Sequence, residues 1–191
     1  MQKVEPFFKT QTEAFPRVVV LIGGNLQSNF FLGRIMINIR EAKLEDIDTL
    51  FKIRTSVGEN YQSREELAEL GVTPQTVANM LQTDCCAWIG EINRQAVGFS
   101  MANATQKTIF GMFVLPAFEG RGVGRQLMQK AEEWLWSQGA EEIWLLTGND
   151  PAFRAYGFYL HLEWIPVEVQ SKGEVKFIKK RASINPHTLS K

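Results

Sequence analysis

The chain has 191 residues, of which 45% are hydrophobic and 22% are charged, so we expect one globular domain with some extra length. Basic and acidic residues both number 21, which leaves no net positive field to attract nucleic acid or an anionic membrane surface. No apolar run approaches the roughly 20 residues that a membrane span requires. We therefore expect neither nucleic acid nor a membrane as a partner.

The first 34 residues differ from the rest of the chain. They contain Pro6, Pro16 and the turn signal Gly23-Gly24-Asn25, and they show no sustained hydrophobic period. We interpret residues 1–34 as a loosely attached extension, or as translated upstream sequence without a role. The domain itself is predicted over residues 35–182, and residues 183–191 form a tail.

The first half of the predicted domain begins with a strand, because Ile35, Ile37 and Ile39 alternate with more polar residues. Ser63 and Glu66 have the spacing of a capping box, and Pro74 suits the first position of a helix. Three helices are therefore predicted, over residues 44–56, 64–70 and 74–82. A hairpin follows around Asn93-Arg94, with strands over residues 86–91 and 96–101.

The second half alternates strands and helices. A strand over residues 108–115 leads into a glycine-rich loop, and a helix with one apolar face then runs to Gly139. The remaining elements are a buried strand at 143–146, a helix at 152–162, and strands at 164–169 and 175–179. The pattern predicts a mixed α/β domain with a central β-sheet flanked by helices.

The cysteines give no sign of a disulfide or a metal site. Cys85 and Cys86 are adjacent, and neighbours on a strand point to opposite faces. The histidines, His161 and His187, are far from them in sequence. We expect two core thiols, no metal, and a reducing, cytoplasmic location.

The loop Phe-Glu-Gly-Arg-Gly-Val-Gly stands at a strand end and opens a helix. Free backbone N–H groups and the positive end of the helix dipole meet there, so anions bind at such places. Gly120, Gly122 and Gly124 remove side chains that would hold a phosphate away, and Arg121 and Arg125 add positive charge. The motif is neither a P-loop nor a dinucleotide fingerprint. Taken alone, it is also compatible with a plain strand-to-helix turn.

The wider stretch FVLPAFEGRGVGRQLMQKAEEW resembles motif A of the GCN5-related N-acetyltransferase superfamily. The matching positions are Val114, Pro116, Phe118, Gly122, Gly124, Leu127 and Met128. A second stretch, LLTGNDPAFRAYGFYLHLEW, is similar to a later segment of the same family. Its matching positions are Arg154, Ala155, Phe158, Tyr159, Leu162 and Trp164. The resemblance covers about residues 36–180 and implies the acyl-CoA N-acyltransferase fold.

The resemblance implies transfer of an acetyl group from acetyl-coenzyme A to a primary amine of a small molecule or peptide, in one ternary complex. In that family, backbone amides of the loop hold the pyrophosphate; here these belong to Arg121, Gly122, Val123, Gly124 and Arg125. The pantetheine arm pairs with the preceding strand, at Phe113, Val114 and Leu115. That strand is expected to splay from its parallel neighbour at residues 142–147.

Tyr159 occupies the family's position for the general acid that protonates the departing thiolate. A phenol has a pKa of about 10 and a thiol of about 8.5, so a tyrosine is a suitable donor. Alternatively, Tyr159 is a core aromatic residue without a catalytic role. Tyr156, one turn away, is the second candidate for the general acid. Glu59 is the candidate general base; alternatively, it is a solvated loop carboxylate without a catalytic role. Asn60 and Tyr61 are candidate substrate contacts.

Two residues depart from the family pattern. Glu119 stands where the family has Gln or Arg, so Arg121 and Arg125 should compensate its charge, or it should face solvent. Glu163 stands where the family has Gly, which should change how the last helical turn ends. The predicted strand over residues 108–115 carries no carboxylate, whereas many members of the family have one there. This absence and Glu119 leave a second hypothesis open: a non-catalytic acyl-coenzyme A sensor on the same fold. A homodimer is also compatible with the sequence.

Overall fold

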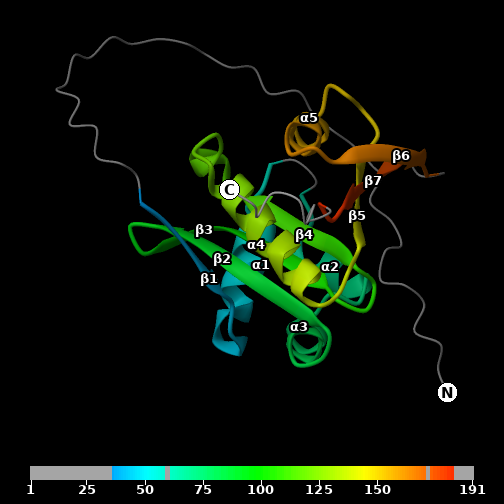
Figure 1. The fold of residues 1–191 in the computed structure, drawn as a ribbon. Helices are drawn as coiled ribbons and strands as arrows, with labels where there is room; N and C mark the ends of the chain where they lie inside the picture. Colours follow the sequence, from blue (N-terminus) through cyan, green and yellow to red (C-terminus); the bar gives the residue numbers. More distant parts are fainter. Residues whose placement is uncertain (1–35, 59–60, 171–172, 183–191) are drawn as a thin grey trace, which may run out of the picture.

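A mixed sheet of seven strands organises the part of the chain that the structure describes, residues 36–58, 61–170 and 173–182 of a computed structural model (Figure 1). The strands lie in the order β1 (Ile37–Glu41), β2 (Cys85–Ile92), β3 (Gln95–Asn103), β4 (Thr108–Val114), β5 (Glu142–Gly148), β7 (Glu174–Lys180) and β6 (Ile165–Val169). The predicted mixed α/β fold is confirmed. The predictions for residues 1–34 and 183–191 concern segments outside the described residues.

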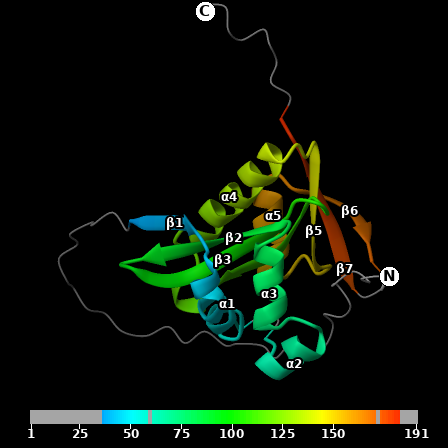
Figure 2. The same ribbon diagram turned by 90° about the horizontal axis from the view of Figure 1, so that it is seen from below.

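Helices cover both faces of this sheet, as Figures 1 and 2 show. One face carries α1 (Ile47–Arg54), α2 (Arg64–Glu69) and α3 (Pro74–Leu81), with α1 packed on β3 and α3 packed on β2. The other face carries α4 (Val123–Ser137), which crosses β2, β3 and β4, and α5 (Arg154–His161), which packs on β5. Short 3-10 turns, η1 (Leu44–Asp46) and η2 (Pro116–Phe118), precede α1 and follow β4.

Local capping explains where the helices on the first face begin. The Ser63 hydroxyl accepts a hydrogen bond from the Glu66 N–H at 3.1 Å, and the Glu66 carboxylate accepts one from the Ser63 N–H at 2.7 Å. The predicted start of α2 is therefore confirmed. The helix expected from residue 44 begins later, because η1 comes first. There the Asp46 carboxylate accepts from the Lys43 N–H and from Arg40, at 2.8 and 2.7 Å.

The core lies on both sides of the central strands. Cys86 faces the cluster under α4, whereas Cys85 faces the cluster under α1 and α3. Burial raises the pKa of both thiols to about 12, so they stay protonated. The predicted apolar face of α4 is confirmed, since its buried residues are Val123, Leu127, Met128, Ala131 and Leu135.

The parallel neighbours β4 and β5 touch at one end and then separate. Their register contains a single pair, Thr108 with Trp144. The Thr108 hydroxyl donates to the Trp144 carbonyl at 2.9 Å, and the Trp144 N–H donates to the Lys107 carbonyl at 3.1 Å. The register with β3 shifts at a bulge, since Met101 lies opposite Gly111 and Ala102 lies opposite Ile109, and bulges bend the strand that carries them. This agrees with the splayed strand that the resemblance implied.

The end of α5 keeps the left-handed turn that a glycine would favour. Glu163 has φ of 64°, its N–H donates to the Leu160 carbonyl, and the Trp164 N–H donates to the Tyr159 carbonyl at 3.1 Å. These two bonds make a Schellman motif. The expectation that Glu163 changes the last turn was therefore wrong. Trp164 is only 1% exposed, and its burial in the core holds the turn in place despite the unfavourable φ.

Candidate functional site

The loop between β4 and α4 needs glycine at two positions. Gly120 has φ of 71° and Gly122 has φ of 88°, a region that residues with a Cβ rarely adopt. Gly122 is also the N-cap of α4, so no side chain there satisfies the first N–H groups of the helix. The backbone at the helix start is left open to a ligand.

The backbone N–H groups of residues 120–125 donate to no acceptor among the described residues. The first bond of the helix is from the Gln126 N–H to the Gly122 carbonyl, at 3.2 Å. A row of free donors at a helix N-terminus carries partial positive charge and binds anions such as phosphates. The predicted anion site at Arg121, Gly122, Val123, Gly124 and Arg125 therefore has the required backbone geometry.

The charged side chains around this loop differ from those expected. Arg125 lines the pocket beside the loop, but Arg121 lies over the Phe118 ring, with 5.2 Å from its guanidinium carbon to the ring centroid. Glu119 forms an ion pair with Arg154, the first residue of α5. Of the two alternatives for Glu119, compensation by Arg121 and Arg125 was therefore wrong, whereas exposure to solvent is confirmed, since its side chain is 37% exposed. The compensating cation comes from the other side of the gap between the strands.

We call the pocket beside this loop the loop pocket. It extends from the glycines along the separated end of β4 to α5, and its residues include Met112, Phe113, Val114, Phe118, Glu119, Gly120, Gly122, Gly124, Arg125, Arg154, Phe158 and Tyr159. Gly124 lets the start of α4 lie close to its neighbours, because a Cβ there would be 3.1 Å from the Met112 methyl group and 3.4 Å from the Phe158 ring. The third glycine thus serves close packing.

Only every second residue of β4 directs its backbone amide toward the gap between β4 and β5. The Leu115 N–H donates to the Val97 carbonyl on β3 at 2.8 Å, and antiparallel neighbours exchange bonds at every second residue. The amide of Phe113 therefore also faces β3, whereas those of Met112 and Val114 face the gap. The structure supports Val114 as an edge for a ligand, adds Met112, and does not support the amides of Phe113 and Leu115.

Tyr159 lies on α5 at the end of the loop pocket. Its side chain is buried, and its ring packs against Phe177 and Trp164 with centroids 5.8 and 6.3 Å away. Its hydroxyl has no hydrogen-bond partner among the described residues. Burial raises the pKa of Tyr159 to about 12, so the hydroxyl keeps its proton at neutral pH. Tyr156 instead packs on Phe177 at 5.1 Å and does not line the pocket.

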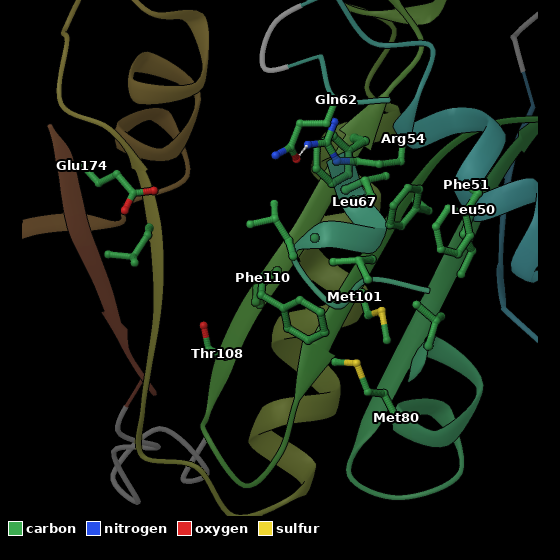
Figure 3. Close-up of a pocket in the computed structure, with 18 of the residues that line it drawn as sticks. Leu50, Phe51, Arg54, Gln62, Leu67, Met80, Met101, Thr108, Phe110 and Glu174 are labelled. Carbon is green, nitrogen blue, oxygen red and sulfur yellow. Dashed lines mark hydrogen bonds between the residues drawn. The ribbon is translucent and has the colours of Figure 1, made fainter. Parts of the chain in front are cut away.

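A second space lies on the other face of β4, and we call it the apolar cavity (Figure 3). It has a volume of about 180 Å³ and lies between the α1–α3 layer and strands β3, β4 and β5. Its apolar walls are Leu50, Phe51, Leu67, Leu70, Val72, Val77, Met80, Phe99, Met101, Ile109, Phe110, Phe113, Trp144 and Leu146. Phe113 lines both spaces, so the loop pocket and the apolar cavity share this residue as part of their walls.

The polar side chains of the apolar cavity lie on opposite sides of it. Arg54 donates a hydrogen bond to the Gln62 side chain, and its guanidinium carbon lies 4.7 Å from the Phe113 ring centroid. Burial lowers the pKa of Arg54 from its usual value. Glu174, at the start of β7, lines the cavity from across the gap (Figure 3).

Tyr61 is the one predicted substrate-side residue that lies among the described residues. Glu59 and Asn60 lie outside the described residues. Tyr61 is 59% exposed and is not among the residues that line either space, whereas its neighbour Gln62 lines the apolar cavity. Sequence reasoning missed Arg54, Gln62 and Glu174, because nothing in their local sequence marks them. The capping signal at Ser63 could have shown that the chain turns back toward the sheet beside Gln62.

Two classes of feature are not found in the described part of the chain. None of its helices is long and apolar enough to cross a membrane. No group of three or more His, Cys, Asp or Glu side chains is placed to hold a metal ion within residues 36–58, 61–170 and 173–182.

Comparison with known proteins gives matches over the same region. The model of the acetyltransferase (GNAT) family matches residues 45–164, which include the glycine loop and Tyr159. An uncharacterized N-acetyltransferase of Archaeoglobus fulgidus is 30% identical over 137 residues, covering 63% of this chain and 88% of its own length. One of Chlorobaculum tepidum is 26% identical over 135 residues, covering 69% of this chain and 81% of its own length.

Solved structures share the fold. The PaiA N-acetyltransferase of Thermoplasma acidophilum, in complex with coenzyme A, superposes with a TM-score of 0.66. Its sequence identity is 17%, and the match covers 77% of this chain and all of the other. The ribosomal-protein-S18-alanine N-acetyltransferase of Escherichia coli has a TM-score of 0.58 and 16% identity, covering 78% of this chain and 98% of its own.

Proposed function

This chain belongs to the acetyltransferase (GNAT) family, and on that premise we propose that it transfers the acetyl group of acetyl-coenzyme A to a primary amine of a small molecule or peptide. One observation carries the proposal: four residues of the loop with free N–H groups, Gly120, Gly122, Gly124 and Arg125, line the same pocket as Tyr159. Anion binding and proton donation, the two demands that this reaction makes, are therefore placed along a single path.

The loop pocket suits acetyl-coenzyme A in three respects. The free N–H groups and Arg125 suit the pyrophosphate, which is anionic. The edge amides of Met112 and Val114 suit the amide-like pantetheine arm, which adds to a free strand edge as an extra strand would. The far end of the pocket, at Tyr159, then receives the thioester. In this arrangement the acyl group is aimed at Phe113, which lines both the loop pocket and the apolar cavity.

In the proposed reaction, an amine in the apolar cavity attacks the thioester directly in a ternary complex. The amine reacts as a neutral base, so its ammonium form must first lose a proton. Glu174 is the carboxylate that lines the cavity among the described residues, and we propose that it binds the ammonium and accepts this proton, directly or through water. Tyr159 donates a proton to the departing thiolate of coenzyme A.

Two findings favour an enzyme over a non-catalytic sensor on the same fold. Glu119 was the reason to doubt coenzyme binding, and its charge is paired with Arg154. Strand β4 carries no carboxylate, but Glu174 reaches the cavity from β7.

The buried thiols of Cys85 and Cys86 fit a reducing compartment, so we propose a cytoplasmic location.

The first experiment is a thermal melt with and without acetyl-coenzyme A, with adenosine diphosphate for comparison. At 100 times the Kd, binding adds about 2.7 kcal/mol, which is a rise in Tm of about 5–10 °C for a chain of this size. A larger rise with the coenzyme than with the diphosphate supports use of both the loop and the β4 edge. No rise with either ligand would refute the proposed site.

A matched pair of glycine variants locates the binding. Gly122→Ala and Gly139→Ala both force alanine to positive φ, at 88° and 84°, and neither new Cβ meets an atom closer than 3.9 Å. Each should lower stability by about 1 kcal/mol. Gly122 is in the loop and Gly139 follows the other end of α4, so only Gly122→Ala should reduce the coenzyme-induced rise in Tm. Equal reductions in both would place the coenzyme elsewhere.

Turnover is measured as release of the coenzyme A thiol in the presence of amine acceptors. Glu174→Gln keeps the shape of the side chain but removes its charge. We expect the KM for the amine to rise roughly tenfold, since an ion pair in a partly buried site is worth one to a few kcal/mol, with the KM for acetyl-coenzyme A unchanged. Kinetics identical to those of the unmodified protein would exclude Glu174 from the site.

A further inference from the structure

The apolar cavity also restricts the kind of amine that can react, and this inference rests on the proposed function. We propose that the acceptor is a primary amine carried on an apolar group of about the size of a phenyl ring. Amines with a second charge, such as polyamines, and small polar amines are then poor acceptors. The inference stands on the walls of the cavity, on its volume and on the position of its charges.

Most of the wall is apolar, and side chains from both the helices and the sheet contribute to it. Leu50 and Phe51 come from α1, Leu67 from α2, and Met80 from α3. The sheet contributes further apolar side chains, from β3, β4 and β5, namely Phe99, Met101, Ile109, Phe110, Phe113, Trp144 and Leu146. A polar group on the acceptor that faces these apolar side chains would lose its water without gaining a partner, which costs roughly 1–3 kcal/mol per group.

The volume sets the size of the group. The cavity measures about 180 Å³. An apolar cavity of about 150 Å³ in another protein stays dry and binds benzene. One aromatic ring or a branched alkyl chain of similar size therefore fits. Met80 and Met101, whose side chains are flexible and polarisable, can adapt to either shape.

The surroundings of an amine bound at Glu174 disfavour a second cationic group on the acceptor. Figure 3 shows Arg54 and Gln62 side by side, with Met101 and Met80 farther along the cavity and Glu174 across from them. An amine held by Glu174 directs the rest of its structure toward the apolar walls or toward Arg54. A second ammonium would meet hydrocarbon along these walls, where a charge without a partner is unfavourable.

The test compares 2-phenylethylamine with ethanolamine and putrescine at saturating acetyl-coenzyme A. Burial of a phenyl group is worth about 1.5–3 kcal/mol, so we expect kcat/KM for 2-phenylethylamine to be higher by roughly 10- to 100-fold. Met80→Gln has nearly the same length and places an amide in the wall. It should lower kcat/KM for 2-phenylethylamine roughly tenfold and leave the KM for acetyl-coenzyme A unchanged. Met36→Gln, at a side chain that is 76% exposed, is the matched control and should change neither.

The outcomes separate this inference from the proposed function. If ethanolamine or putrescine reacts as well as 2-phenylethylamine, the inference is overturned while acetyl transfer stands. If no amine reacts, calorimetry of 2-phenylethylamine with the coenzyme A-loaded protein decides. Binding that Met80→Gln weakens would support the cavity assignment although the proposed function had failed. Absence of both binding and turnover would overturn the inference as well.

Discussion

Replacing Tyr159 by phenylalanine removes one hydroxyl group and keeps the ring that packs on Phe177 and Trp164. The hydroxyl has no hydrogen-bond partner among the described residues, so its loss leaves no orphaned donor or acceptor there. We therefore expect the free energy of unfolding to change by less than about 1 kcal/mol. A change in turnover then reports chemistry and not damage to the fold.

The size of the effect follows from the environment of the hydroxyl. Burial raises the pKa of Tyr159 to about 12, and it raises the pKa of the Cys85 and Cys86 thiols to about 12 as well. The Tyr159 hydroxyl therefore keeps its proton at neutral pH and can donate it to a departing thiolate. General acid catalysis is worth roughly 100- to 10,000-fold, so kcat of Tyr159→Phe should fall at least about 100-fold.

The assay is steady-state release of the coenzyme A thiol between pH 6 and 9, together with the Kd of acetyl-coenzyme A. We expect kcat to fall and the Kd to change by less than about threefold, because the phosphate contacts are at the other end of the loop pocket. Tyr156→Phe is the matched control, since Tyr156 is on the same helix but outside the pocket. A kcat for Tyr159→Phe within threefold of the unmodified protein, or an equal loss in Tyr156→Phe, would refute the reasoning.

Three further predictions concern other parts of the molecule. Glu163→Gly relieves a left-handed residue, so Tm should rise by about 2–4 °C in a thermal melt. Arg154→Gln leaves Glu119 unpaired beside the phosphate site, so a ligand titration should show the Kd of acetyl-coenzyme A raised roughly threefold to tenfold, and Glu119→Gln in the same chain should restore it. Arg40 lowers the pKa of Asp46 to about 2 from 3.8, so the stabilisation is present above pH 4 and is lost as pH falls toward 2. Because Arg40 is 37% exposed, Asp46→Asn should cost about 1 kcal/mol in urea melts at pH 7, and the difference should vanish near pH 2.

Each of these has an outcome that contradicts it. A lower Tm for Glu163→Gly would show that the glutamate side chain stabilises the turn by more than the strain costs. A double variant that binds no better than Arg154→Gln would mean that Arg154 contacts the ligand itself. A pH-independent effect of Asp46→Asn would remove the ion pair with Arg40 as its cause.

The sequence located those features that depend on near neighbours in the chain. Ser63 and Glu66 are three residues apart, so the start of α2 follows from two local hydrogen bonds. The backbone at the start of α4 has a positive φ at residue 122, which favours glycine, and this requirement also depends only on the local backbone. The glycine loop, the apolar face of α4 and the position of Tyr159 on a helix were therefore predictable. The end of α5 was not, because a buried Trp164 holds Glu163 in a turn that local preference opposes.

The sequence by itself determined the family resemblance, the helix caps and the glycine loop, because each is encoded by residues within one or two turns of one another. Only the tertiary structure decided that Arg154 pairs with Glu119 and that Glu174 faces the space beside Arg54. These partners lie on different elements, and their meeting depends on strand order, on the bulge between β3 and β4 and on the splay of β4 from β5. Such long-range geometry is set by how whole elements pack, which no local pattern of residues specifies.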